Sequence, residues 1–149
     1  MAIYLARHGE AVSAEKNSER PLSSEGRSEV EKMAFLMANF GVKVEKVIHS
    51  GKKRAEESAE IFSEKICDGK ISKSKGLDPN DDVKEFWKKY ENTDRVMYVG
   101  HLPFMEKFAS FILTGEEYGV LLKIKTGGVV CLDRSEDRWF IRWMFSPDL

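Results

Sequence analysis

Two histidines and two arginines, distant in sequence, supply the side chains that phosphoryl transfer requires. Arg7 and His8 adjoin near the N-terminus, while Arg54 and His101 lie far downstream. A neutral imidazole is a good nucleophile at pH 7, and a covalent phosphoenzyme divides hydrolysis into two easier steps. Guanidinium groups are permanently charged and present a planar fork to phosphate oxygens. We therefore expect His8 to attack phosphorus while Arg7, Arg54 and His101 bind the phosphoryl oxygens.

Each of these residues also has an ordinary structural interpretation. Arg54 alone is more often a solvated helix residue, His101 alone is more often a hydrogen-bonded core histidine, and Arg-His-Gly occurs by chance in many proteins. The third histidine, His49, lies in a predicted strand and lacks the tight ligand spacing of a zinc site. We interpret His49 as structural, and we expect no metal and no other cofactor.

The catalytic candidates all follow predicted strands, which is the pattern of a binding crevice in an α/β sheet. Buried strands are predicted over Ala2–Ala6, Val44–His49 and Arg95–Val99. They lead into Arg7-His8, into the helix start that carries Arg54, and into His101. Because ligands bind outside the carboxyl ends of strands in open α/β sheets, we expect these groups to converge.

The remaining elements complete an α/β sandwich. Helical spacing of apolar residues predicts four helices, which carry Val30 to Met37, Ala55 to Ile66, Val83 to Tyr90 and Phe104 to Ile112. Further strands are predicted over Lys70–Ser74, Val120–Lys125, Gly128–Asp133 and Trp139–Phe145. The sequence contains no repeat and no long linker, so we expect one domain over residues 1–149.

Composition excludes several classes of protein. The 149 residues include 24 basic and 25 acidic side chains in mixed order, so we expect no nucleic-acid partner. No apolar run approaches the roughly 20 residues that span a bilayer, and the N-terminal apolar run is too short for a signal peptide. Cys67 and Cys131 lie far apart in apolar surroundings, which is typical of reduced thiols. We expect a soluble, cytoplasmic protein that does not bind membranes.

Four segments resemble the histidine phosphatase superfamily. Arg7-His8-Gly9 followed by Glu10 matches its signature, and Gly100-His101 matches its second histidine. Residues 20–23, Arg-Pro-Leu-Ser, are similar to its Arg-Pro-Leu-Thr turn, and residues 50–59 are similar to its Ser-x-x-x-Arg-Ala-x-x-Thr-Ala helix. The departures are Gly51 where proline is common, Glu57 for a common glutamine and Ser58 for threonine. None of them removes a group of the expected pocket.

The resemblance implies a fold, a site and a subfamily. The fold is a phosphoglycerate mutase-like, three-layer α/β/α sandwich with a mostly parallel central sheet. His8 becomes phosphorylated, and Arg7, Arg54 and His101 form a pocket that holds phosphate or sulfate without a metal. The short chain, the segment 77–79 and the closing segment 143–147 look most like SixA-type phosphohistidine phosphatases.

No convincing general acid appears in the sequence. The candidates are Glu10, Asp78, Asp81 and Asp82, and their usual interpretation is as solvated caps. An alkoxide leaving group needs a proton, whereas an imidazole, with a pKa of about 6.5, can depart neutral. Together with the absence of a large insertion over the site, this favours a phosphohistidine on a signalling or phosphotransfer protein as the substrate.

Two alternative functions stay open: a small-molecule phosphomonoesterase, and a non-catalytic module that binds phosphorylated ligands. Two further interpretations are also open. Lys52 and Lys53 beside Arg54 either begin a solvated helix or attract an acidic partner protein. Arg20 either approaches the phosphate or is a surface turn residue, and we leave it out of the core set.

Overall fold

The elements alternate between strand and helix for most of the chain, as the sequence predicts. The structure is a computed structural model that describes residues 1–118 and 121–148. Its elements in chain order are β1 (Ala2–Arg7), α1 (Ser24–Asn39), β2 (Val44–His49), α2 (Lys53–Ile66), β3 (Cys67–Lys73), α3 (Val83–Tyr90), β4 (Val96–Gly100), α4 (Phe104–Thr114), β5 (Val129–Ser135) and β6 (Arg138–Phe145). Within the described residues, no helix has the length and apolar character needed to cross a membrane.

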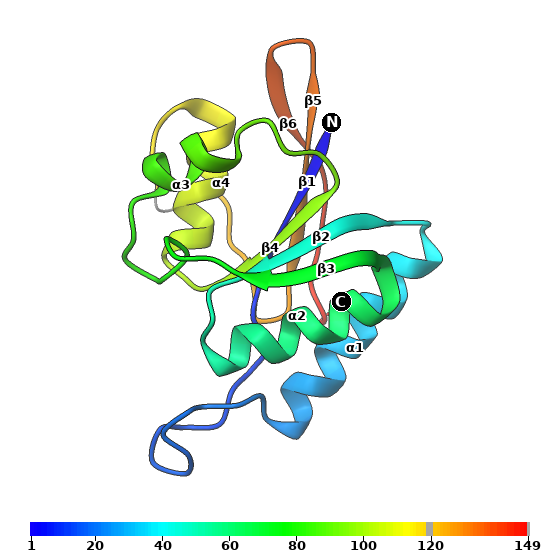
Figure 1. Ribbon diagram of the computed structural model, residues 1–149, viewed down its shortest axis with the longest axis vertical. Helices are drawn as coiled ribbons and strands as arrows, with labels where there is room; N and C mark the ends of the chain where they lie inside the picture. The colour runs from blue at the N-terminus through cyan, green and yellow to red at the C-terminus, as the bar shows by residue number, and fades with distance from the viewer. Residues whose placement is uncertain (119–120, 149) are drawn as a thin grey trace.

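The strands form one six-stranded sheet in the order β3-β2-β4-β1-β5-β6. The first four of these strands are parallel, whereas β5 and β6 are antiparallel to their neighbours. The register pairs Arg7 with Gly100 and His49 with Val99. The carboxyl ends of β1, β4 and β2 therefore lie at one edge of the sheet (Figure 1).

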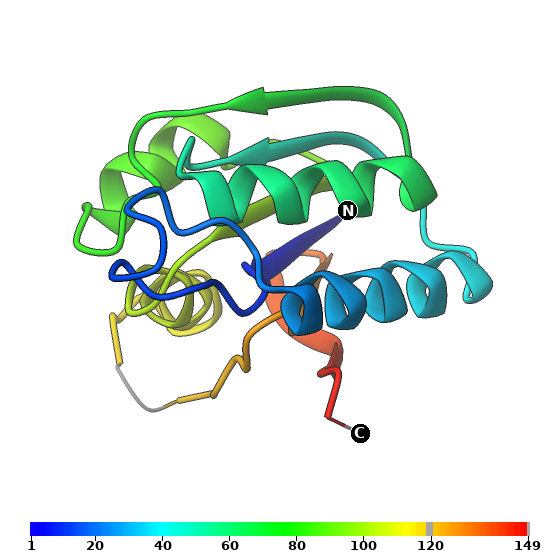
Figure 2. The same cartoon turned by 90° about the horizontal axis from the view of Figure 1, so that it is seen from below.

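Helices cover both faces of the sheet and complete the three layers (Figure 2). Successive side chains of a strand point to opposite faces, so β1 contributes to two cores. Tyr4 and Ala6 pack in the core under α1 and α2, whereas Ile3 and Leu5 pack in the core under α3 and α4. The mostly parallel three-layer sandwich is confirmed.

One predicted strand is wrong. Residues 121–125 form no strand, and Val120 lies outside the described residues. The backbone of this segment bonds to side chains instead of a neighbouring strand: Ile124 donates its N–H to Glu106 Oε2 at 2.8 Å and accepts from Arg7 Nη1 at 3.0 Å. An apolar run in the sequence does not show whether its backbone N–H and C=O groups bond to a neighbouring strand or to side chains.

The long connection between β1 and α1 projects beyond the carboxyl edge of the sheet (Figure 1). It is closed by a hydrogen bond from Val12 N to Pro21 O at 2.9 Å, and Ser23 then caps α1 by accepting from Gly26 N at 2.9 Å. Gly26 is required at this place, since an added Cβ would lie 2.1 Å from the carbonyl oxygen of Glu10. The backbone just after His8 is thus held against the start of α1.

Candidate active site

The ends of β1, β4 and β2 bring both predicted histidines together. The ring centroids of His8 and His101 lie 5.0 Å apart. The backbone N–H of His8 donates to Gly100 O at 3.0 Å, which ties the two strand ends at this point. Ser50, directly after β2, places its hydroxyl oxygen 2.6 Å from His101 Nε2.

The first turn of α2 is fixed to the loop that carries His8. Ser58 is buried, and its hydroxyl accepts from Gly9 N at 2.9 Å and donates to Arg54 O at 2.7 Å. A hydroxyl can accept and donate at once, so the serine that replaces threonine supplies both bonds. The helix α2 begins at Lys53 with Lys52 as N-cap, and the Ser50 hydroxyl contacts His101 rather than capping the helix.

Three buried side-chain nitrogens in the described residues lack a hydrogen-bond partner, and all belong to predicted site residues. They are Arg7 Nε, Arg54 Nε and His101 Nδ1. Leaving a buried polar group unpaired costs about 1–3 kcal/mol, so proteins rarely tolerate it without a reason. A phosphoryl group, which offers several accepting oxygens, suits this set of nitrogens.

Both imidazoles are held neutral. Burial, helped by the charges of Arg54, Arg7 and Arg20 and opposed by a hydrogen bond to Gly9, lowers the pKa of His8 to about 4. Burial likewise lowers the pKa of His101 to about 3, assisted by His8 and Arg54. His8 Nδ1 lies 2.7 Å from the carbonyl oxygen of Gly9. Because a carbonyl only accepts, Nδ1 carries the hydrogen and Nε2 keeps a free lone pair.

Comparison with known proteins assigns the family. Residues 3–79 match the histidine phosphatase superfamily (branch 1), which is more than half of the chain. The chain belongs to the histidine phosphatase superfamily. The family assignment confirms the predicted resemblance and makes the chain, in coarse terms, a phosphatase-type hydrolase. A curated relative, an uncharacterized protein of Picosynechococcus sp., is 26% identical over 140 residues, 89% of this chain and 84% of the relative.

Solved structures share the fold of this superfamily member along its whole length. The protein histidine phosphatase SixA complexed with tungstate superposes with a TM-score of 0.85 at 24% identity, covering 99% of this chain and 98% of that one. SixA from Agrobacterium tumefaciens gives 0.80 at 23% identity, covering 98% and 97%. The α-ribazole phosphatase from Shigella flexneri also gives 0.80, at 14% identity, covering 99% and 97%. The fold is confirmed.

Arg20 belongs beside the histidines of this phosphatase, although the sequence interpretation left it outside the core set. Its Nε donates to Val12 O at 3.1 Å, so the β1–α1 connection fixes the side chain. Its charge lowers the pKa of His8 and of His101, and it does the same for Arg54. The signal in the sequence was the Arg-Pro turn at residues 20–21. Spacing did not show that the β1–α1 connection folds back and brings Arg20 towards the two histidines.

Glu106 is a second residue that the sequence interpretation missed. It lies on α4 with 8% of its surface exposed, and its charge opposes the lowering of the Arg7 pKa by burial. Glu106 accepts from Ile124 N, and the carbonyl of the same residue accepts from Arg7 Nη1. The only signal was that Glu106 is the one carboxylate of a largely apolar helix. Through Ile124, Glu106 positions the guanidinium of Arg7.

The four acidic candidates form no hydrogen bond or ion pair with either histidine in the described residues, although the charge of Asp78 opposes the lowering of the Arg54 pKa by burial. Asp82 accepts from Lys84 N and Asp81 accepts from Asp78 N, at 2.9 and 2.8 Å, while Glu10 is 3.3 Å from the hydroxyl of Ser23. Of these three, only Asp82 is a helix N-cap, that of α3. Asp78 is exposed and lies 4.0 Å from Lys52 Nζ. His49 does not take part in the His8–His101 pair either. It is buried, and its Nδ1 accepts from Gly51 N at 3.0 Å, as in a structural histidine.

The neutral state of the two histidines is testable by NMR titration of the ligand-free protein. We expect the ring protons of His8 and His101 not to titrate between pH 8 and about 5, because burial and nearby cations lower both pKa values. In Arg20→Gln both pKa values should rise, since a like charge is removed. A pKa near the ordinary value of about 6.5 for His8 in the wild type would contradict this site.

The positioning role of Glu106 is testable by the affinity for inorganic phosphate, measured by calorimetry. Glu106→Ala should weaken phosphate binding about tenfold because Ile124 and Arg7 lose their support, whereas Glu106→Gln, which keeps an acceptor, should stay within about threefold. Ser110→Ala is the matched control, since Ser110 is also a buried polar residue of α4 with backbone partners. Equal losses in Glu106→Ala and Ser110→Ala would show a general packing effect instead.

Proposed function

We propose that this protein is a metal-independent phosphohistidine phosphatase, one domain over residues 1–149, in which His8 is the nucleophile. The observation that carries the proposal is a neutral, buried His8 with Nε2 free, next to the unpartnered nitrogens of Arg7, Arg54 and His101. A nucleophilic nitrogen and a set of fixed donors are the two parts that a covalent phosphoryl transfer needs.

The reaction has two steps. His8 Nε2 attacks phosphorus, a new N–P bond forms, and the bond to the leaving group breaks. Arg7 and Arg54 neutralise the charge spread over the three equatorial oxygens, neutral His101 donates a hydrogen bond to them, and Arg20 adds positive charge at the same place. A water molecule then attacks phosphorus and releases phosphate and neutral His8. Gly9 O keeps the hydrogen on Nδ1 throughout, so Nε2 is again the free nitrogen.

The leaving group is inferred from the acids that surround the pocket. Asp82 caps α3, Asp81 accepts from Asp78 N, Glu10 lies 3.3 Å from the Ser23 hydroxyl, and Asp78 has a side chain that is 56% exposed and paired with Lys52. An imidazole leaving group needs a donor less than an alkoxide does. This favours phosphohistidine over an alkyl phosphate.

Two further observations support a protein substrate and a cytoplasmic setting. One solved relative is named a protein histidine phosphatase and was complexed with tungstate, an oxyanion of the kind this pocket suits. Cys67 and Cys131 are both free thiols, as expected in a reducing compartment. The proposed partner is a cytoplasmic protein that carries a phosphohistidine, and neither a nucleic acid nor a membrane is part of the proposal.

The main alternative is a small-molecule phosphomonoesterase. It is favoured by fold relatives named α-ribazole phosphatase and phosphoserine phosphatase. Those enzymes share only the fold with this chain, at 14% and 13% identity. A non-catalytic phospho-ligand module is the other alternative, and turnover alone separates it from an enzyme.

Substrate preference is tested by kcat/KM on three substrates without metal. They are a histidine peptide phosphorylated with phosphoramidate, phosphoserine, and p-nitrophenyl phosphate, whose leaving group needs no acid. We expect turnover of the first and third, with phosphohistidine preferred over phosphoserine by about a hundredfold or more. His8→Ala should lose more than about a thousandfold on both.

His49→Gln is the control for that experiment, because it removes an imidazole that lies outside the proposed machinery. It should keep activity on p-nitrophenyl phosphate within about fivefold. A preference for phosphoserine would favour the phosphomonoesterase, and a wild-type protein that binds phosphate but turns over none of the three would favour the binding module.

A further inference from the structure

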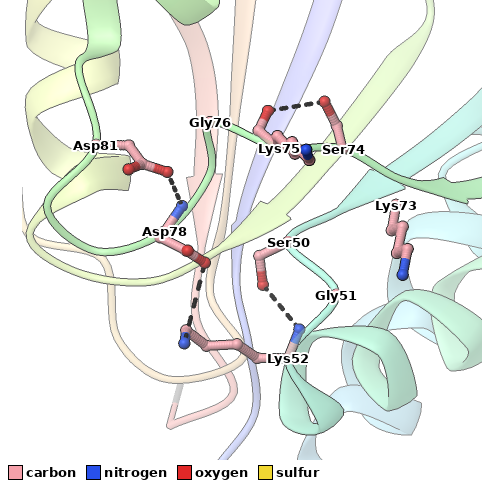
Figure 3. A pocket seen from close by; sticks show the side chains of 9 residues that line it. All are labelled: Ser50, Gly51, Lys52, Lys73, Ser74, Lys75, Gly76, Asp78 and Asp81. Carbon is pink, nitrogen blue, oxygen red and sulfur yellow. Dashed lines mark hydrogen bonds and ion pairs between the residues drawn. The ribbon is translucent and has the colours of Figure 1, made fainter.

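A cleft of about 820 Å³ opens directly beside the proposed phosphoryl site (Figure 3). One wall is the β2–α2 connection at residues 50–52, and the other is the segment from the end of β3 towards α3, residues 73–76 with Asp78 and Asp81. We call it the lysine cleft, after Lys52, Lys73 and Lys75. It lies at the carboxyl edge of the sheet, on the β3 side of the two histidines.

The lysine cleft is continuous with the phosphoryl site. Ser50 lines the cleft, and its hydroxyl lies 2.6 Å from His101 Nε2. Lys52 is close enough that its charge lowers the pKa of His101. A substrate polypeptide whose phosphoryl group is bound at His8 and His101 would therefore enter this cleft if it runs from the site towards β3.

The charge of the cleft is unevenly compensated. Asp78 Oδ1 lies 4.0 Å from Lys52 Nζ, whereas Asp81 accepts only from the neutral backbone N–H of Asp78, so its charge has no cationic partner in the described residues (Figure 3). Lys73 and Lys75 are exposed and form no ion pair within the described residues. Three lysines against two aspartates leave the cleft with a net charge of +1, and Lys73 and Lys75 are the lysines open to a ligand of opposite charge.

The lysine-bearing wall is built on fixed backbone. Ser74, between the two lysines, is buried, and its hydroxyl donates to Lys75 O at 2.9 Å and lies 3.0 Å from Tyr90 Oη of α3. Across the cleft, Gly51 has a φ of +93°, and an added Cβ would lie 3.5 Å from Lys73 Cδ. Each lysine therefore projects from an anchored position, which reduces the entropy lost on binding.

We propose that the lysine cleft binds an acidic polypeptide segment that flanks the phosphorylated residue of the partner protein. This inference rests on the proposed function and adds the chemistry of the partner. Carboxylates of the segment pair with Lys73 and Lys75 while the phosphoryl group occupies the pocket. A small phosphate ester is too short to engage both, so the cleft selects proteins with acidic flanks.

Binding is tested with a fluorescein-labelled, unphosphorylated peptide of four Asp and Glu residues separated by Gly and Ser, followed by anisotropy. The double variant K73E/K75E should lose at least about tenfold in affinity, because two attractions become repulsions. The matched control is K46E/K70E, which makes the same charge change at a pair of exposed lysines facing each other across β2 and β3. This control should stay within about twofold.

Three results would overturn the lysine cleft as a docking site. One is no binding of the acidic peptide to the wild type. Another is an equal loss in both double variants, which would indicate bulk electrostatics. The third is displacement of the peptide by inorganic phosphate at a concentration that fills the pocket, because the peptide would then occupy the phosphoryl site. Retained binding in the presence of phosphate supports the cleft.

A second readout links the cleft to turnover. Two phosphohistidine peptides, one with acidic and one with neutral flanks, are compared by the ratio of their kcat/KM values. The ratio should favour the acidic peptide in the wild type and fall about tenfold in K73E/K75E but not in K46E/K70E. If neither peptide is hydrolysed, the proposed function fails, while the anisotropy experiment still decides the cleft. A ratio near one in the wild type overturns the selection.

Discussion

One constraint organises this molecule: an uncharged imidazole must be kept among permanently charged guanidinium groups. Burial and the charges of Arg54, Arg7 and Arg20 together hold the pKa of His8 at about 4. The carbonyl of Gly9 then decides which ring nitrogen carries the hydrogen. Gathering cations without a counter-anion is costly, and the cost is recovered only when an anion binds between them. In the proposed mechanism, the same arrangement creates both the nucleophile and its specificity for phosphoryl groups.

The fold supplies that arrangement by simple topology. Three parallel strands end at one edge, and each is followed by a residue of the site. Short hydrogen-bonded links then fix the side chains: Ser58 joins the loop of His8 to Arg54, and Ile124 joins Glu106 to Arg7. The antiparallel strands β5 and β6 complete the sheet on the side of β1 away from β4. Membership of the histidine phosphatase superfamily agrees with this construction.

The sequence predicted the parts of the site that are encoded locally. Arg7, His8 and His101 follow short apolar strands, and Arg54 opens an amphipathic helix, so periodicity and strand ends were enough to place them. It did not predict what depends on distant partners. Residues 121–125 look like a strand, yet their backbone bonds to Arg7 and Glu106. The position of Arg20 depends on a connection closed between Val12 and Pro21, which no local pattern records.

The most direct test of the central claim is a rapid-quench experiment with a radiolabelled phosphohistidine protein in a single turnover. The account predicts a transient label on the enzyme that survives alkali, is lost in acid and maps to the peptide that contains His8. The label should be absent from His8→Ala. Release of phosphate in a single turnover with no labelled enzyme, or a label on another residue, would contradict the account.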